Sequence, residues 1–166
     1  MRKIVILLVL ILCLSGCAAA PTFETLGPVA HQPDQLPAIA SVQLDLPESA
    51  TAQTFGAGAD TFYECDGYTL VMQTQTSGDF YHTLRSLSGF TPEKLTVMES
   101  TVGQTHRYDW VWSAAAEEGE MICRAAVLDD GNYHYCLYTL APAHLGSELT
   151  EEWNMLFASF CLGSTE

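Results

Sequence analysis

Alternating apolar and polar positions predict extended segments at the start of the folded part of the chain. In residues 41–47, SVQLDLP, apolar residues occupy every second position before a proline. Residues 60–65 and 68–76 are two further extended runs, separated by Asp66 and Gly67, a pair that favours a tight hairpin turn. We therefore expect three strands here, the last two joined as a hairpin.

The apolar period then changes from two residues to that of a helix. Ser77 or Asp79 can cap the N-terminus of this helix, and Gly89 favours its C-terminal end. Its expected buried stripe is Phe80, Leu84 and Leu87. A short helical turn at Pro92 leads into another expected strand, residues 95–101.

Two long strands and a hairpin follow. Residues 105–114 alternate with a period of two, and residues 120–140 contain two alternating runs around Asp130–Gly131. This dipeptide favours a two-residue type I′ turn, which would place Asp129 opposite Asn132.

The chain closes with a second predicted helix over residues 147–160, capped by Ser147 or Thr150. Its expected buried stripe is Trp153, Leu156, Phe157 and Phe160. Strands that follow one another through hairpins form antiparallel sheets. The sequence therefore predicts an α+β domain, with an antiparallel β-sheet of about six strands packed with two main α-helices.

The N-terminus has the pattern of a secretory signal. Arg2 and Lys3 precede an apolar run of eleven residues, Ile4–Leu14, which is too short to cross a bilayer core of roughly 30 Å. Residues 14–17, LSGC, resemble the bacterial lipobox, which implies cleavage before Cys17 and attachment to its sulfur of a diacylglycerol that carries fatty acyl chains such as palmitate. An ordinary signal peptide, cut after one of the alanines at 18–20, is the alternative.

These features divide the chain into three parts. Residues 1–16 form the lipoprotein signal peptide, and residues 17–40 form a lipidated, proline-rich tether without helical or strand periodicity. Residues 41–163 form a single α+β domain. We expect the protein on the extracytoplasmic face of the cell membrane, with the membrane as a partner through the lipid anchor.

The chain is strongly acidic. Its formal net charge is −14, and removing residues 1–16 leaves four cations against twenty acidic residues, a net charge of −16. Nucleic-acid binding requires cationic neutralisation of phosphates, so this composition excludes it. An acidic surface can attract a basic partner, or it can serve only to keep the domain soluble.

Four cysteines lie in the domain: Cys65, Cys123, Cys136 and Cys161. With the two-residue turn, Cys123 and Cys136 share a sheet face at a diagonal of roughly 7 Å, near the limit for a disulfide. Cys65 and Cys161 would then pair by elimination. Four buried free thiols are the alternative, and the spacings match no zinc framework.

The sequence contains no recognisable catalytic motif, cofactor motif or metal site. His134 lies beside Asp129 and Asp130, which suggests a metal ligand or a general base, and two positions from Cys136, which suggests a thiol-histidine dyad. A structural histidine is the alternative to all of these. A reactive thiolate needs positive surroundings, whereas these are acidic.

Aromatic residues on the long strands are the candidate binding surface. Together with Tyr108, this set contains Trp110, Trp112, Tyr133 and Tyr135. If exposed, such side chains form a platform for a sugar ring or a peptide. Otherwise they pack one sheet face beneath a helix.

The element order, the ending WNMLFASFCL and the turn LDDGNYHY resemble the PsbP-like superfamily and small lipoproteins of Gram-positive Clostridia. The matching residues are Trp153, Phe157, Ser159 and Phe160. The resemblance implies a binding or assembly module, with a protein or carbohydrate partner, rather than an enzyme. An extracytoplasmic hydrolase that uses residues near the 123–136 hairpin is the alternative.

Overall fold

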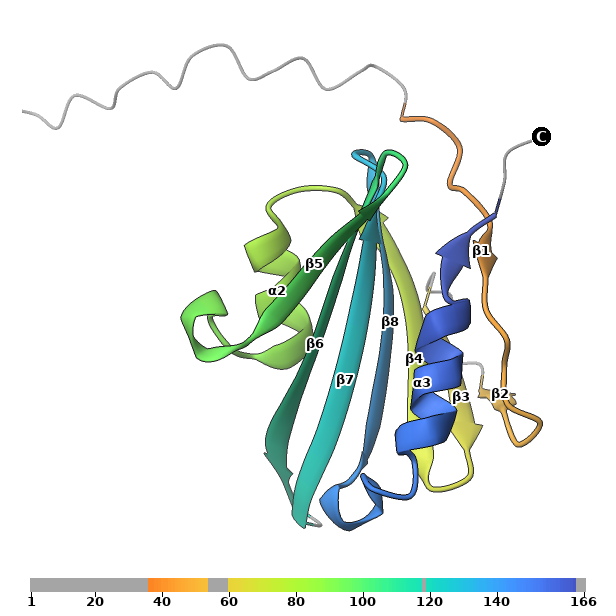
Figure 1. Ribbon diagram of the computed structural model, residues 1–166, viewed down its shortest axis with the longest axis vertical. Helices are drawn as coiled ribbons and strands as arrows, with labels where there is room; N and C mark the ends of the chain where they lie inside the picture. The colour runs from red at the N-terminus through yellow and green to blue at the C-terminus, as the bar shows by residue number, and fades with distance from the viewer. Residues whose placement is uncertain (1–35, 54–59, 118, 164–166) are drawn as a thin grey trace, which may run out of the picture. The chain divides into compact units, whose positions relative to one another are not determined.

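A seven-stranded antiparallel sheet forms the centre of the computed structural model (Figure 1), which describes residues 36–53, 60–117 and 119–163. The strand order is β2-β3-β4-β8-β7-β6-β5, and the described residues from Pro37 onward form one compact unit. The strands are β2 (Thr51–Gln53), β3 (Thr61–Cys65), β4 (Tyr68–Thr76), β5 (Val97–Val102), β6 (Thr105–Ala116), β7 (Gly119–Asp129) and β8 (Tyr133–Pro142). The expected α+β class is confirmed, with seven strands in the main sheet.

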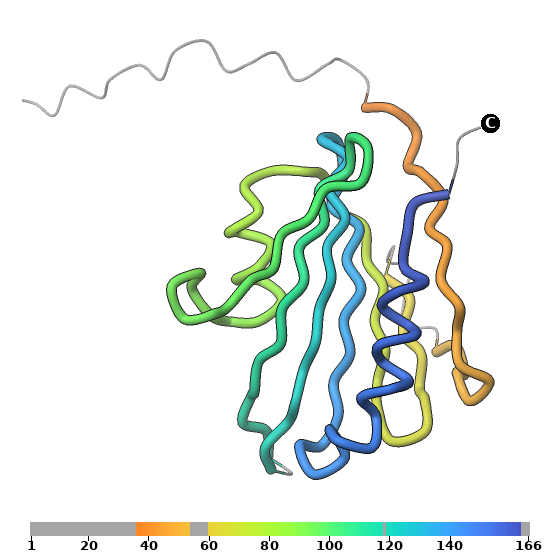
Figure 2. Tube along the Cα trace, viewed as in Figure 1, coloured from red at the N-terminus to blue at the C-terminus, as the bar shows by residue number. Residues whose placement is uncertain are grey.

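A separate two-stranded ribbon joins the two ends of the domain. Strand β1 (Val42–Gln43) pairs antiparallel with β9 (Cys161–Leu162), and Figure 2 shows these segments side by side. Of the strand expected over residues 41–47, only the two residues of β1 are paired in a sheet. Strand β9 has no signal in the local pattern, because its pairing partner is more than a hundred residues away.

The first helix, α2 (Phe80–Ser88), has the predicted ends. The Asp79 side chain accepts a hydrogen bond from the Tyr81 N–H at 3.0 Å, so Asp79 rather than Ser77 is the N-cap. Gly89 has φ 75°, and its N–H donates to the Arg85 carbonyl. A 3-10 turn, η1 (Pro92–Lys94), follows.

The second helix, α3 (Thr150–Ser159), follows the 3-10 turn η2 (Ala143–Leu145). No side chain caps its N-terminus: Leu149 occupies the N-cap position, and the Thr150 hydroxyl donates back to the Gly146 carbonyl. The predicted caps are therefore wrong. The predicted stripe is correct, because its four residues are all buried: Trp153, Leu156, Phe157 and Phe160.

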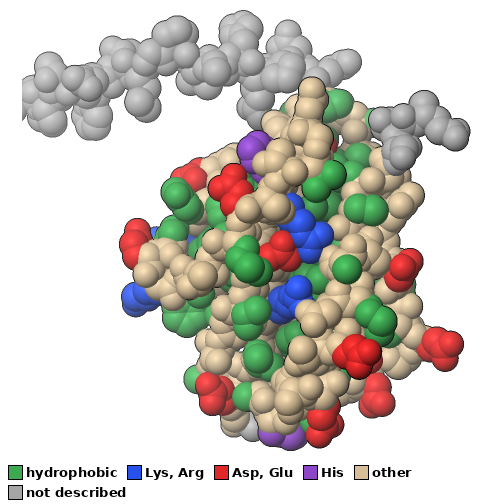
Figure 3. Space-filling view, in the orientation of Figure 1, with side chains coloured by type: hydrophobic (Ala, Val, Ile, Leu, Met, Phe, Trp, Pro, Cys, Tyr) green, Lys and Arg blue, Asp and Glu red, His purple; other side chains and the backbone are tan. Residues whose placement is uncertain are grey.

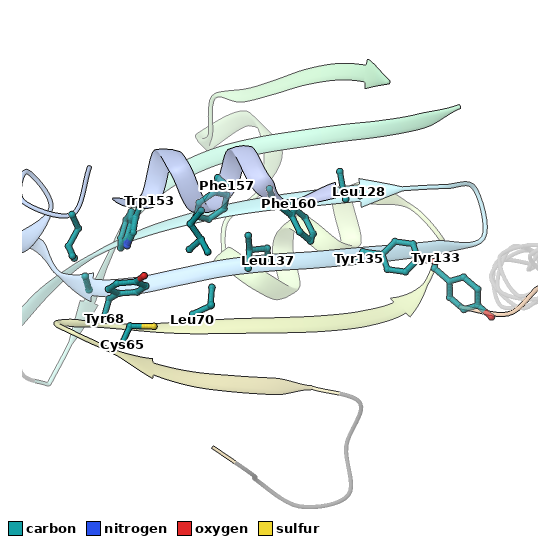
Figure 4. Close-up of a cluster of buried hydrophobic side chains, with 14 residues drawn as sticks. Cys65, Tyr68, Leu70, Leu128, Tyr133, Tyr135, Leu137, Trp153, Phe157 and Phe160 are labelled. Carbon is teal, nitrogen blue, oxygen red and sulfur yellow. The ribbon is translucent and has the colours of Figure 1, made fainter. Parts of the chain in front are cut away.

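The two helices cover opposite faces of the sheet. Helix α3 packs with residues such as Leu70 and Leu137 in one core cluster (Figure 4), whereas Leu84 of α2 packs with Trp110 and Val127 in the other. Because β4, β7 and β8 are buried on both faces, the strict apolar alternation of a one-sided sheet breaks down there.

The β7–β8 turn differs from the expected type. Strand pairing ends at Asp129 opposite His134, so four residues rather than two lie between the last paired residues. The Asp130 carboxylate accepts hydrogen bonds from the N–H groups of Asn132 and Tyr133 at 2.8 and 2.7 Å. These side-chain bonds stabilise the longer loop and shift the register by two residues from the predicted one.

Candidate functional site

The predicted aromatic platform is not formed. Trp110 and Trp112 are buried under α2, whereas Tyr133 and Tyr135 are buried on the opposite face of the sheet. The partly buried Tyr108 stacks on Phe80 at 3.8 Å between ring centroids. The alternation of the long strands was correct, but α2 packs on the face that carries Trp110 and Trp112, and the opposite core cluster buries Tyr133 and Tyr135, so these aromatic side chains pack into the core.

Tyr133 and Tyr135 instead bind the backbone of residues 37–40, the segment that leads into the domain. The Tyr133 hydroxyl donates to the Pro37 carbonyl at 2.8 Å, and the Tyr135 hydroxyl accepts from the Ala40 N–H at 3.0 Å. Tyr135 also donates to Asp130 at 2.9 Å. Residues 37–40, assigned to the tether from the sequence, therefore lie against the domain beside the β7–β8 turn.

His134 is fully buried in a hydrogen-bonded network. Its Nδ1 lies 2.8 Å from the Thr83 hydroxyl, and its Nε2 lies 3.3 Å from the Ser77 hydroxyl and 3.5 Å from Asp129. Ser77 in turn donates to Asp129. Through Nδ1 the ring thus joins α2 to the sheet, and through Nε2 it contacts the segment before α2 and strand β7.

The proposed thiol-histidine dyad is not formed. The contact between the two residues joins the Cys136 thiol to the backbone carbonyl of His134 at 3.9 Å, not to its ring. Burial raises the pKa of the Cys136 thiol to about 12 and that of Cys123 to about 11. These thiols are neutral near pH 7, so the geometry gives no support to a hydrolase at this hairpin.

All four domain cysteines are free thiols in the structure. Cys123 and Cys136 share a sheet face as expected, but Cys123 pairs with Leu140 and Cys136 with Val127. The two are therefore four ladder positions apart, about 13 Å, well beyond the reach of a disulfide.

The second candidate pair is separated by the length of α3. Cys65 lies beside Tyr68 at the Trp153 end of the core (Figure 4), and Cys161 follows Phe160 at the other end. Trp153 and Phe160 are about 10 Å apart along a helix axis. The structure therefore supports neither predicted pair.

Two hollows are candidate pockets at different places in the domain. One of about 720 Å³ lies at the end of the sheet away from Tyr133, between the β3–β4 and β6–β7 turns, and its lining includes Glu64, Glu120 and His144. The other, of about 420 Å³, is lined by Tyr81 of α2 and by Glu99 of β5, among others.

The α3 face of the sheet has a part that α3 does not cover. We call it the β5–β6 strip, and it consists of Met98, Val102, Arg107, Asp109, Val111 and the adjoining Arg124 of β7. Met98 is 64 % exposed, Val102 74 % and Val111 53 %. Figure 3 shows this face, with two basic side chains near its middle and hydrophobic side chains around them.

Arg107 links the strip to α3. Its guanidinium forms a bidentate pair with Asp109 at 2.7 and 2.9 Å, and it donates to the carbonyls of Phe157 and Phe160 at 2.8 and 3.0 Å. A cation at the C-terminal end of a helix also complements the helix dipole. Arg107 is therefore fully engaged within the domain.

Arg124 is engaged differently. It donates to the Asn154 side chain at 2.8 Å, and its guanidinium carbon lies 4.3 Å from the centre of the Phe157 ring. Burial lowers the pKa of its guanidinium, while Asp109 raises it and Arg107 lowers it. Over residues 36–53, 60–117 and 119–163, no carboxylate lies within ion-pair distance of Arg124.

Within residues 36–53, 60–117 and 119–163, none of the helices has the length and apolar character of a membrane span. Nor is any group of three or more His, Cys, Asp and Glu residues within those ranges placed to hold a metal ion. Cys17 and the signal sequence lie outside the described residues.

Comparison with known proteins gives a likeness of fold. No family model and no curated protein sequence matches the chain. The solution structure of PsbP from the cyanobacterium Synechocystis sp. PCC 6803 has a TM-score of 0.55 at 11 % identity, covering 83 % of this chain and 99 % of that one. LpqN of Mycobacterium tuberculosis, involved in cell envelope biogenesis, has a TM-score of 0.52 at 12 % identity, covering 77 % and 86 %. The domain therefore has a PsbP-like fold.

Proposed function

We propose that this protein is a lipid-anchored binding or assembly module on the extracytoplasmic face of the cell membrane. The signal pattern of residues 1–16 and the lipobox at Cys17 support the anchor. The tether of about twenty residues that follows would let the domain approach a partner near the membrane. The same fold occurs in LpqN, whose part in cell envelope biogenesis fits an envelope role for this chain.

The β5–β6 strip is the observation that carries the binding role. A sheet face normally buries its apolar side chains under another layer, yet Met98, Val102 and Val111 remain more than half exposed. They lie along one face of two neighbouring strands, with Val102 near one end of the strip and Val111 about 20 Å away along β6, beside two arginines in a chain that has few cations. Exposed apolar side chains gathered on one face are typical of an interaction site.

Fatty-acid labelling in cells tests the anchor. The wild-type chain should incorporate an alkyne-bearing palmitate analogue, and Cys17→Ala should remove the label. Cys13→Ala, the matched control four residues earlier, should keep it. A label that persists in Cys17→Ala would show that the fatty acid is attached at a residue other than Cys17.

Site-specific photocrosslinking tests the binding role in the native host. Benzoylphenylalanine placed at Met98 should give a discrete crosslinked product that disappears when Val111→Glu is added, because the charge would disrupt the apolar strip. Met155 on α3 is equally exposed, at 62 %, and should give no such product. Equal products from both positions, or none from Met98, would contradict the role of the strip.

A further inference from the structure

The width of the β5–β6 strip matches one helix. On this face α3 packs over β4, β7 and β8, while β5 and β6 carry no helix within the described residues. Two strands are roughly 10 Å wide, and an α-helix with its side chains is about 10–12 Å across. One helix lying beside α3 would therefore complete the layer that α3 begins.

The flank of α3 offers two hollows along this line. One, of about 310 Å³, is lined by Val102, Ala158 and Phe160 among others, and the other, of about 230 Å³, by Val111 and Trp153 among others. On the α3 side, Trp153 and the C-cap residue Phe160 are seven residues apart, a spacing of about 10 Å. Apolar side chains at positions i and i+7 of a neighbouring helix have the same separation. About four turns of such a helix also span the roughly 20 Å along β6 between Val111 and Thr105, the residue opposite Val102.

The charge of the strip favours an acidic partner surface. Asp109 neutralises Arg107 at hydrogen-bond distance, whereas Arg124 has an amide and an aromatic ring as its partners. A half-buried guanidinium without a carboxylate retains hydrogen-bonding capacity, since it has five N–H donors. A carboxylate beside Val111 would form a charge-assisted hydrogen bond with Arg124.

We propose that the β5–β6 strip binds an amphipathic helix of a partner protein, with apolar residues at i and i+7 and a carboxylate that reaches Arg124. The helix lies beside α3 and covers Met98, Val102 and Val111. This inference rests on the proposed binding function and names its partner surface. The proposed partner helix carries a negative charge although the protein's own net charge is strongly negative. Bulk electrostatics alone would favour a basic partner.

Synthetic peptides test the inference with the mature chain, residues 17–166, carrying Cys17→Ala to remain in solution. Three labelled peptides of about 18 residues, five helical turns, share one Leu pattern at i, i+3 and i+7. The first has Glu beside the Leu stripe, the second has Gln at those positions, and the third has two central prolines that prevent a helix. Fluorescence anisotropy measures each affinity.

The Glu peptide should bind about tenfold more tightly than the Gln peptide, and the proline peptide should not bind. Val111→Glu should weaken the Glu peptide at least about tenfold, which corresponds to about 1.4 kcal/mol. Arg124→Gln should abolish the difference between the Glu and Gln peptides while leaving the Gln peptide unchanged. Met155→Glu, the control of equal exposure, should change neither affinity, and circular dichroism checks the folding of each variant.

Several outcomes would overturn the inference. Equal binding of the proline peptide would indicate an extended ligand on the β5 edge, and a Glu preference that survives Arg124→Gln would remove the role of that residue. A concentration-dependent dimer abolished by both Val111→Glu and Met98→Glu would identify a second copy as the occupant. If no peptide binds but crosslinking at Met98 persists, the helix is wrong and the binding function stands. If both fail, the binding function falls too.

Discussion

Cys123 and Cys136 illustrate how position in the core determines the chemistry of a residue. Both lie in the layer beneath α2, where desolvation disfavours a charged thiolate. Sequence spacing alone suggested a disulfide or a nucleophile at these positions. Burial and register instead make them apolar packing residues with weakly acidic thiols.

Stability should therefore decrease at alkaline pH through these two thiols. Their pKa values rise from 9.0 to about 11 and about 12 on folding, so the unfolded chain releases protons first. The stabilisation that these two neutral thiols give to the folded chain is complete below pH 9. It is lost as the pH rises through their pKa values in the folded chain. Urea unfolding of Cys123→Ala/Cys136→Ala should show a smaller loss between pH 9 and 11 than the wild type. Parallel curves for the two proteins would contradict this account.

Arg107 shows how one side chain joins two elements. From β6 it reaches the C-terminal carbonyls of α3, and Asp109 on the same strand face fixes its orientation. Helix α3 has no side-chain cap at its N-terminus, so this attachment at the other end is important for its position. The link spans about fifty residues of sequence, and no local pattern signals it.

Arg107→Ala should lower the free energy of unfolding by about 2–3 kcal/mol, because it leaves a mostly buried Asp109 unpaired and removes two donors from the helix end. Arg107→Lys should lose less, since it keeps the charge without the bidentate geometry. Urea unfolding provides the measurement. The exposed Arg85→Ala is the control, expected within about 0.5 kcal/mol of the wild type, and an equal effect of both alanine variants would refute the link.

For the whole molecule, the point at which the chain enters the domain is fixed by two tyrosines. Tyr133 and Tyr135 bind the backbone of residues 37–40 beside the β7–β8 turn, and the β1–β9 ribbon continues the attachment. The domain thus starts at one end of the sheet. The 720 Å³ hollow lies at the other end, about 35 Å away along β7.

Tyr135→Phe should release this attachment without unfolding the domain. The Ala40 amide loses its acceptor, so its hydrogen exchange should become at least about tenfold faster, the equivalent of a lost hydrogen bond of about 1.4 kcal/mol. The Asp45 amide, which donates to Ser159, is an internal control and should be unchanged. NMR or mass spectrometry can follow both amides. Unchanged exchange at Ala40 would show that the tyrosine hydroxyl does not hold the segment.

The sequence by itself determined the features that depend on local spacing. The Asp66–Gly67 hairpin, the capped helix from Phe80 and the buried stripe of α3 follow from side-chain periodicity and turn chemistry, which act over a few residues. These features were sufficient to predict the α+β class. The fold likeness to PsbP confirms that part of the prediction.

The tertiary structure decided which faces are covered and which are open. Alternation in β6 identifies two faces, but it cannot show that α2 buries Trp110 on one while Val111 remains exposed beside α3 on the other. The Asp130 side-chain bonds set a register that the Asp-Gly dipeptide did not predict. Both depend on contacts between segments distant in sequence or on competing local hydrogen bonds, which is why the candidate site, unlike the fold class, could only be located in three dimensions.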